Sequence, residues 1–299
     1  MTPTQAAQTK PLVTFQSILF ATDFSSASNV ALPYAADLAR TFGAKLLALH
    51  VKEPANYALS PEVWASAEAA CDLEMDVLRT RLKHEGTGLT TEVLEGEGGL
   101  WPALASALEG RKVDLIVVGT RGRTGIGKAL LGSHAEEILR RATCPVLTVG
   151  PHAAPEEGQG TSPASILFAT DFGPASAAAL PFAISLAEKY QAKLTLLHVL
   201  KNMRRNEIAV PEIFEESDLR NLRDLIPSGL DLLPVPHYIV EEGEPAQKIL
   251  EVADRTSADL IVLGAHKLAR VPGAATHLPI ATVHNVVARA RCPVLTVHS

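Results

Sequence analysis

Short apolar segments alternate with longer amphipathic ones along the first half of the chain. The short segments are rich in leucine and β-branched residues. Apolar and polar residues do not alternate regularly within them, a pattern typical of strands covered on both faces. They lie at residues 18–22, 45–51, 90–95, 114–119 and 145–150. We therefore predict five buried strands.

The longer segments repeat their apolar residues every three or four positions, which predicts helices. They lie at residues 25–43, 60–86, 99–112 and 133–143. Gly43 and Gly86 stand where helix C-caps are expected. Five strands joined by four helices predict a parallel, doubly wound α/β sheet. In such sheets ligands sit beyond the carboxyl ends of the strands, where the strand order reverses.

The whole pattern occurs twice. Residues 18–51 and 166–199 align without a gap, and about 21 of the 34 positions agree. Residues 151–163, rich in proline, glycine, serine and charge, are expected to be a linker. We expect a disordered N-terminus over residues 1–14, one domain over residues 15–150 and a second over residues 164–299.

Composition narrows the class of protein. Of 299 residues, 47% are hydrophobic and 20% are charged, and the formal net charge is −6. This charge gives no overall positive field for nucleic acid or an anionic membrane. No run approaches roughly 18 apolar residues, and the N-terminus lacks the apolar core of a signal peptide. We predict a cytoplasmic protein that binds neither nucleic acid nor membrane.

The three cysteines are too few for a disulfide framework and show no metal-binding spacing. Cys144 and Cys292 each precede the same sequence, PVLTV. Packing in the core is the favoured interpretation of both.

A glycine-rich, basic segment follows the fourth predicted strand. Residues 119–133 read GTRGRTGIGKALLGS, and their spacing is Gly119-x2-Gly122-x9-Gly132-Ser133. Ser133 is expected to be the N-cap of the next helix, with Glu136 completing a capping box. Glycines and a helix N-terminus together favour an anion site, because free backbone N–H groups can approach the ligand closely.

Three basic residues, Arg121, Arg123 and Lys128, add positive charge to this segment. Spacing alone leaves open a surface loop in front of a capped helix. A P-loop is not favoured, because Ala129 stands where that motif requires serine or threonine.

Two other strand ends carry candidate ligand contacts. Asp23 directly follows the first predicted strand, where its carboxylate could accept a hydrogen bond from a ligand, although helix capping is an equally good interpretation. His50 and Val51 end the second predicted strand. A histidine at such a position is more often packed and hydrogen-bonded than a ligand contact.

Together these motifs resemble the universal stress protein family, once in each half. The resemblance rests on ILFATDFS, LHV, VDLIVVGTRG, the G-x2-G-x9-G-S spacing and CPVLTV. It implies two Rossmann-like domains of the adenine nucleotide alpha hydrolase-like type, each a five-stranded parallel sheet of order 3-2-1-4-5. The two halves of a tandem member are expected to pair through their last strands as an intramolecular pseudo-dimer.

In the ATP-binding branch of that family, the matching positions contact the nucleotide. The resemblance implies that the Asp23 carboxylate and the Val51 backbone hold adenine and ribose. It assigns the ribose and phosphates to the glycine-rich segment and the following helix start, at Gly119, Arg121, Gly122, Gly132, Ser133 and His134. The expected cofactor is ATP, with or without Mg²⁺.

The second half departs from this pattern. Asp171, His198, Val199 and Gly264 remain, but Lys267 stands opposite Gly122, and Ile280 and Ala281 stand opposite Gly132 and Ser133. A branched side chain at residue 280 would obstruct a phosphate, so we predict one ATP site, in the first half. The spacing of His266, His277 and His284 fits no compact zinc motif, and no metal site is predicted.

Three functions remain open at this point. The leading hypothesis is a nucleotide-responsive regulatory protein of the stress response. The others are a slow ATPase, for which no catalytic residue can be named, and a scaffold that binds no nucleotide. A homodimer and an unidentified protein partner are compatible with each of them.

Overall fold

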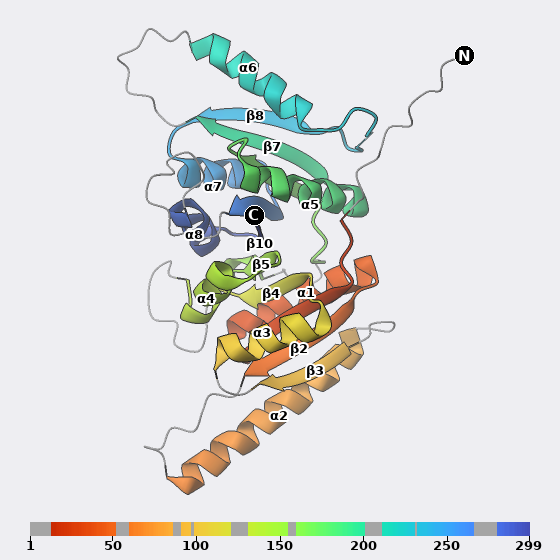
Figure 1. Ribbon diagram of the computed structural model, residues 1–299, viewed down its shortest axis with the longest axis vertical. Coiled ribbons are helices and arrows are strands. Elements are labelled where there is room, and N and C mark those ends of the chain that lie inside the picture. The colour runs from red at the N-terminus through yellow and green to blue at the C-terminus, as the bar shows by residue number, and fades with distance from the viewer. Residues whose placement is uncertain are drawn as a thin grey trace, which may run out of the picture.

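A computed structural model describes most of the chain. The described residues are 13–51, 60–85, 91–96, 99–120, 131–154, 160–200, 211–230, 232–265 and 280–299. The first half lies at the bottom of Figure 1 and the second half at the top.

The first half contains the five strands and four helices predicted from the sequence. In chain order they are β1 (Ser17–Thr22), α1 (Ser26–Phe42), β2 (Lys45–Val51), α2 (Pro61–Glu85), β3 (Thr91–Gly96), α3 (Leu100–Arg111), β4 (Leu115–Gly119), α4 (Ser133–Arg141) and β5 (Val146–Val149). A 3₁₀ turn, η1 (Pro151–Ala153), follows.

The second half repeats this order. Its elements are β6 (Ser165–Thr170), α5 (Pro174–Tyr190), β7 (Lys193–Leu200), α6 (Pro211–Asp224), β8 (His237–Glu242), α7 (Pro245–Arg255), β9 (Leu260–Ala265), α8 (Ile280–Arg289) and β10 (Val294–His298).

Helix α1 shows how local sequence sets these boundaries. The Ser25 side chain caps its start by accepting a hydrogen bond from the Ser28 N–H group. Gly43 ends the helix in the left-handed conformation, at φ 66°, and its N–H group bonds to carbonyls of the last turn. The predicted C-cap at Gly43 is therefore confirmed. Gly86 lies outside the described residues.

All ten strands form one sheet. Its order is β3-β2-β1-β4-β5-β10-β9-β6-β7-β8, and each half shows the expected order 3-2-1-4-5. Neighbouring strands within each half are parallel, whereas β5 and β10 pair antiparallel with Leu147 opposite Leu295. The predicted pairing of the halves through their last strands is confirmed.

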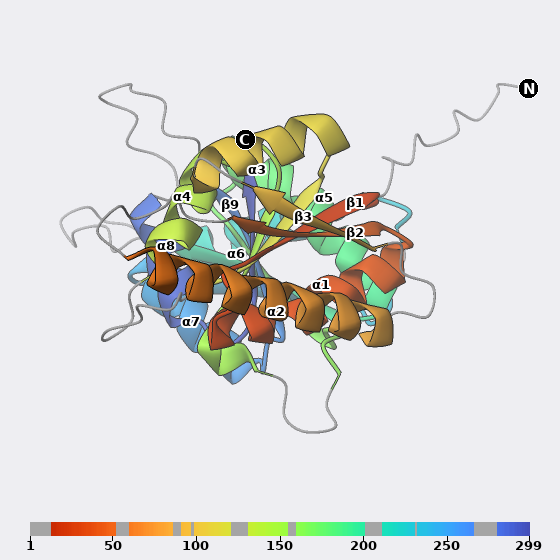
Figure 2. The same ribbon diagram turned by 90° about the horizontal axis from the view of Figure 1, so that it is seen from below.

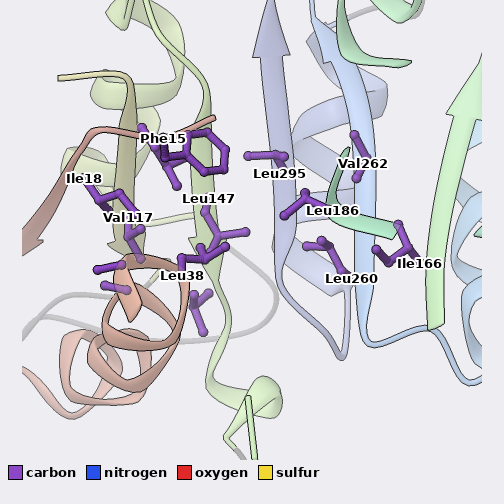
Figure 3. Close-up of a cluster of buried hydrophobic side chains, with 14 of the residues drawn as sticks. Phe15, Ile18, Leu38, Val117, Leu147, Ile166, Leu186, Leu260, Val262 and Leu295 are labelled. Carbon is purple, nitrogen blue, oxygen red and sulfur yellow. The ribbon is translucent and has the colours of Figure 1, made fainter. Parts of the chain in front are cut away.

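Helices cover both faces of this sheet. One core lies under α1, α2, α5 and α6, and the other lies under α3, α4, α7 and α8. Figure 2 shows α1 and α2 on one side of the first-half strands and α3 on the other. Both cores contain residues of both halves. Figure 3 shows the core under α1, α2, α5 and α6 continuing across the junction at Leu147, Leu295 and Leu186.

The segments that precede the two first strands cross to the opposite half. The Val13 N–H group donates to the Ser185 hydroxyl of α5 over 2.9 Å, and the Phe15 ring lies 6.1 Å from the Phe182 ring. In the reverse direction, the Ser162 hydroxyl donates to Asp37 of α1 over 3.0 Å. The halves therefore exchange corresponding segments across their junction.

None of the three cysteines, all of which the structure describes, forms a disulfide bond. Cys144 and Cys292 are partly buried and pack against the core under α3 and α4, which confirms the predicted packing role. Burial raises the pKa of the Cys292 thiol to about 12, so it stays protonated.

Candidate functional site

The candidate site lies where the strand order of the first half reverses. Strand β1 lies between β2 and β4, and the chain reaches these two neighbours through helices on opposite faces of the sheet. The carboxyl ends of the three parallel strands therefore meet at one edge. Asp23 follows β1, Val51 ends β2 and Gly119 ends β4. The topology thus places these three predicted residues at neighbouring strand ends, at the position where doubly wound sheets bind ligands.

Asp23 is held in a tight turn rather than at a helix cap. Its Oδ1 atom accepts a hydrogen bond from the Ser25 N–H group over 2.9 Å, and Ser25 is the residue that caps α1. Burial raises the pKa of Asp23, but hydrogen bonds from Ser25 and Ser28 outweigh this effect and the net pKa is lowered. Asp23 is therefore a half-buried, ionised acceptor at neutral pH.

Residues that the sequence did not single out hold this turn in place. The Thr22 hydroxyl accepts from the Phe24 N–H group over 3.0 Å and donates to the Ser28 hydroxyl over 3.0 Å. Phe24 has φ 60°, in the left-handed region that residues other than glycine rarely occupy. The repetition of TDF in both halves is the only sequence signal for this turn.

His50 is packed, as predicted. Its Nδ1 atom lies 2.9 Å from the Thr22 carbonyl oxygen, and its ring centroid is 4.3 Å from that of Phe24. His50 thus links the end of β2 to the turn after β1. Val51, the next residue, is partly buried and pairs with Gly96 of β3.

The glycine-rich segment leaves β4 and returns to it. The Thr120 N–H group donates to the Val149 carbonyl over 2.9 Å, and the Gly132 N–H group donates to the Thr120 carbonyl over 2.7 Å. The second bond brings Gly132 back to the end of β4. The predicted contacts Arg121 and Gly122, together with Arg123 and Lys128, lie outside the described residues.

The predicted cap of α4 is wrong in one respect. Gly132, not Ser133, is the N-cap residue, and no side-chain hydrogen bond caps the helix. Ser133 is the first helical residue, so its hydroxyl and Glu136 do not form the expected capping box. The physical reason is the return to Thr120, which requires the extended conformation of Gly132 (φ −64°, ψ 147°).

This start leaves the first turn of α4 without a capping side chain. Ser133 and His134 are exposed at that turn. The cap therefore supplies no side-chain acceptor for the first N–H groups at the positive end of the helix. Such a helix start is suited to binding an anion.

The second half preserves the turn after its first strand. Asp171 accepts from the Gly173 N–H group over 2.9 Å and from the Ser176 hydroxyl over 2.6 Å. His198 lies 2.8 Å from the Thr170 carbonyl oxygen and packs on Phe172, which has φ 58°. The strand-end scaffold is therefore common to both halves.

The other side of the second site differs. Residues 266–279, which include Lys267, Pro272, Pro279, His266 and His277, lie outside the described residues. Helix α8 begins at Ile280, the residue opposite Gly132 in the repeat. Among the residues that the structure describes, no group of histidine, cysteine and carboxylate side chains could hold a metal ion.

Comparison with known proteins identifies the family. The model of the universal stress protein family matches residues 14–150 and 164–298. The chain belongs to the universal stress protein family. Universal stress protein MJ0531 of Methanocaldococcus jannaschii is 34% identical over 148 residues, which are 45% of this chain and 82% of that protein.

Longer matches extend into both halves of this universal stress protein. A universal stress protein of Mycolicibacterium smegmatis is 27% identical over 261 residues, 83% of this chain and 86% of that protein. Universal stress protein Rv1996 of Mycobacterium tuberculosis is 30% identical over 198 residues, and the match spans only 58% of its length and 62% of this chain. A crystal structure of a universal stress protein from Archaeoglobus fulgidus has the same fold, with a TM-score of 0.67, 21% identity and coverage of 94% of this chain and 98% of that one.

A membrane-spanning helix was also sought. None of the helices within the described residues combines the length and the apolar character needed to cross a bilayer.

Proposed function

We propose that the first half of this universal stress protein binds ATP and that occupancy of this site regulates a partner surface in the stress response. The observation that carries the proposal is the arrangement of the ligand edge. An ionised Asp23 follows β1, and α4 begins beside the neighbouring strand β4 with a glycine and no capping side chain. A ligand with hydroxyl or amino donors at one end and an anionic group at the other matches this edge.

Each end of ATP has a counterpart in the proposed site. The Asp23 carboxylate would accept from a ribose hydroxyl or the adenine amino group, and the Val51 backbone would lie beside it. The first N–H groups of α4, at Ser133 and His134, would receive the phosphates beside Gly119 and Gly132. An anion at a helix N-terminus is stabilised by about 0.3–1 kcal/mol at an exposed position and up to about 2 kcal/mol when partly buried. Mg²⁺, where present, would be held chiefly by the phosphates, since the described residues include no cluster of carboxylates that could hold a metal ion.

Regulation would follow from linkage between binding and folding. A ligand that binds only the folded domain stabilises it by about 2.7 kcal/mol at a concentration of 100 times Kd. That energy is sufficient to order a loop or a partner surface that is unstable without nucleotide. We place this function in the cytoplasm and assign no catalytic residue.

Isothermal titration of the full chain with ATP tests the proposal, and we expect one site per chain. Asp23→Asn should weaken binding about 10–100-fold, because it removes the charge from a hydrogen bond worth about 1.5–3 kcal/mol. Asparagine retains the oxygen that accepts from Ser25, so the turn should persist. Asp171→Asn is the matched control and should leave the affinity unchanged.

The helix start is tested separately. Gly132→Ile copies the second half at Ile280, and isoleucine can adopt the observed φ of −64°. We expect this substitution to abolish binding while the melting temperature without nucleotide changes little. Two equal sites per chain, or unchanged affinity in both Asp23→Asn and Gly132→Ile, would contradict the proposal. Mass spectrometry of the ligand released on denaturation distinguishes bound ATP from ADP and from no nucleotide.

A further inference from the structure

Helix α2 packs on its own domain through one apolar row. Met75, Leu78 and Leu82 are 0%, 5% and 1% exposed and belong to the described core of the first half. Figure 1 shows α2 as the outermost element of that half, beyond the edge strand β3. The side of α2 opposite these three residues faces away from the domain.

A second row, apolar except for one serine, occupies that outer side. Its members are Val63, Ser66, Ala70, Leu73 and Val77, and all five are exposed. The exposed fractions of the three large ones are 51%, 66% and 45%. Their spacing of three, four, three and four residues is the a/d spacing of a coiled-coil seam. At 100° per residue, this row lies about 130° around the helix from the buried row.

In the part of the row after Val63 the small residues Ser66 and Ala70 precede the large residues Leu73 and Val77, so this part is complementary to itself in the antiparallel direction. When two copies of α2 are aligned head to tail, Ala70 of one lies opposite Leu73 of the other. In the same register Ser66 lies opposite Val77. A parallel alignment would instead place serine against serine and leucine against leucine, which fills the interface unevenly. The one hydroxyl in the seam needs no partner across it, because serine in a helix can donate to the carbonyl four residues earlier.

The charges along α2 favour the same arrangement. Residues 61–78 carry acidic side chains but no basic one, whereas Arg79, Arg81 and Lys83 follow near the end. In the antiparallel register above, Glu62 beside the seam lies on the same side as Lys83 of the second copy, displaced from direct opposition by two residues, or about 3 Å along the helix axis. Complementary charges that flank an apolar seam are what selects the partner and its orientation in coiled coils.

Pairing through the last strands does not provide a contact between copies. The last strands β5 and β10 already pair with each other inside one chain. The corresponding helix of the second half, α6, has 14 residues against 25 in α2. Among the side chains that the structure describes, α2 has three exposed large hydrophobic residues and α6 has none, and a two-fold contact through α2 closes as a dimer. We propose that α2 packs antiparallel against α2 of a second copy of this chain.

Analytical ultracentrifugation of the full chain, from about 1 µM to about 1 mM, tests the proposal. We expect a monomer–dimer equilibrium that Leu73→Glu combined with Val77→Glu weakens at least about tenfold, since both side chains are exposed in one chain but buried in the dimer. Val235→Glu is the matched control, because Val235 is 69% exposed in the second half. It should leave the equilibrium unchanged. All variants should melt like the wild type at concentrations where the chain is monomeric.

Charge reversal tests the orientation. Glu62→Lys and Lys83→Glu should each weaken the dimer, and the double variant should restore it, because the reversed pair is again complementary only in an antiparallel contact. A zero-length carbodiimide cross-linker should join Lys83 to Glu62 of another chain. A wild-type chain that stays monomeric over the whole range would overturn the proposal. So would a dimer that Leu73→Glu with Val77→Glu leaves intact, or a double reversal that fails to restore it.

Discussion

One hydrogen bond across the junction of the two halves yields a quantitative prediction. The Tyr190 hydroxyl of α5 donates to Oδ2 of Asp37 in α1 over 2.8 Å. Burial, followed by the Asp37 charge, raises the pKa of Tyr190, while a hydrogen bond from Thr41 lowers it, and the net pKa is well above 10. The phenol is therefore neutral and able to donate at every physiological pH. A hydrogen bond to a charged group contributes about 1.5–3 kcal/mol.

We expect Tyr190→Phe to lower the free energy of unfolding by about 1.5 kcal/mol, the lower end of that range, because both partners are partly exposed. Asp37 would not be left without a donor, since the Ser162 hydroxyl also donates to it over 3.0 Å. Tyr34→Phe is the matched control. Tyr34 donates to a neutral acceptor, the Ala153 carbonyl, over 2.6 Å, so the expected loss is about 0.5–1.5 kcal/mol.

A double-mutant cycle isolates the pair. Urea unfolding of the wild type, Tyr190→Phe, Asp37→Ala and the double variant should give a coupling energy of about 1–2 kcal/mol between the two residues. The cycle of Tyr34→Phe with Asp37→Ala should give less than about 0.5 kcal/mol, because the structure shows no hydrogen bond between Tyr34 and Asp37 among the described residues. A coupling energy below about 0.5 kcal/mol between Tyr190 and Asp37 would refute the reasoning.

Two further predictions concern packing and pH. Gly264→Ala should destabilise the chain by about 1–3 kcal/mol in urea unfolding, because a methyl group there would collide with the backbone of Ala175 at the start of α5. Gly110→Ala is the control, because a methyl group there meets nothing within 4 Å, and it should not lower the free energy of unfolding. A loss in this control would indicate a general effect of replacing glycine by alanine. Burial raises the pKa of Tyr34 to about 12, against about 10 in the unfolded chain, so the corresponding stability is present below pH 10 and is lost as the pH rises towards 12. Tyr190 also titrates late, so the test uses the Tyr190→Phe variant: its phenolate absorbance should still show a titration near pH 12, and persistence of that step in Tyr190→Phe combined with Tyr34→Phe would contradict the assignment.

The elements of this fold could be predicted from local sequence because each carries its own signal. Unalternated apolar runs marked the strands, and three- to four-residue periodicity with Gly43 at its end marked α1, whose range the structure confirms. The order of the strands came from the family resemblance. The cap of α4 was predicted wrongly because Ser133 has a side chain typical of an N-cap, whereas Gly132 occupies the N-cap position. The hydrogen bond from the Gly132 N–H group to the Thr120 carbonyl, a tertiary contact, fixes that position.

Features that depend on tertiary contacts could not be predicted in this way. Nothing in the local sequence indicated that Phe24 adopts φ 60° or that its ring lies on His50. Helix α2 carries two rows of apolar residues, and periodicity alone does not tell which one faces the domain. The structure assigns the Met75 row to the core and the Leu73 row to the surface.

Gly264 shows why a retained motif residue does not by itself indicate a retained site. The second half keeps this glycine although Ile280 stands at the position of Gly132, where we propose that the first half binds the phosphates. Contact with the α5 backbone explains the glycine without any ligand. The equivalent residue Gly119 stands at the end of β4, so close packing against α1 is expected to constrain it as well. Evidence for nucleotide must therefore come from Asp23 and Gly132.

The junction itself explains how the two halves could diverge within one chain. In a two-fold dimer of identical domains every contact occurs twice, so Asp37 would face the equivalent of Tyr190, which is Phe42, on both sides. A carboxylate beside phenylalanine would lack the hydrogen bond that Tyr190 donates, which would weaken the pairing of two identical first halves. In the tandem chain the second copy supplies Tyr190, and Ser185 replaces the second aspartate. The polar pair therefore stabilises only the pairing of a first half with a second half. Because that pairing is built into each chain, the second half can lose its ligand site and still complete the sheet.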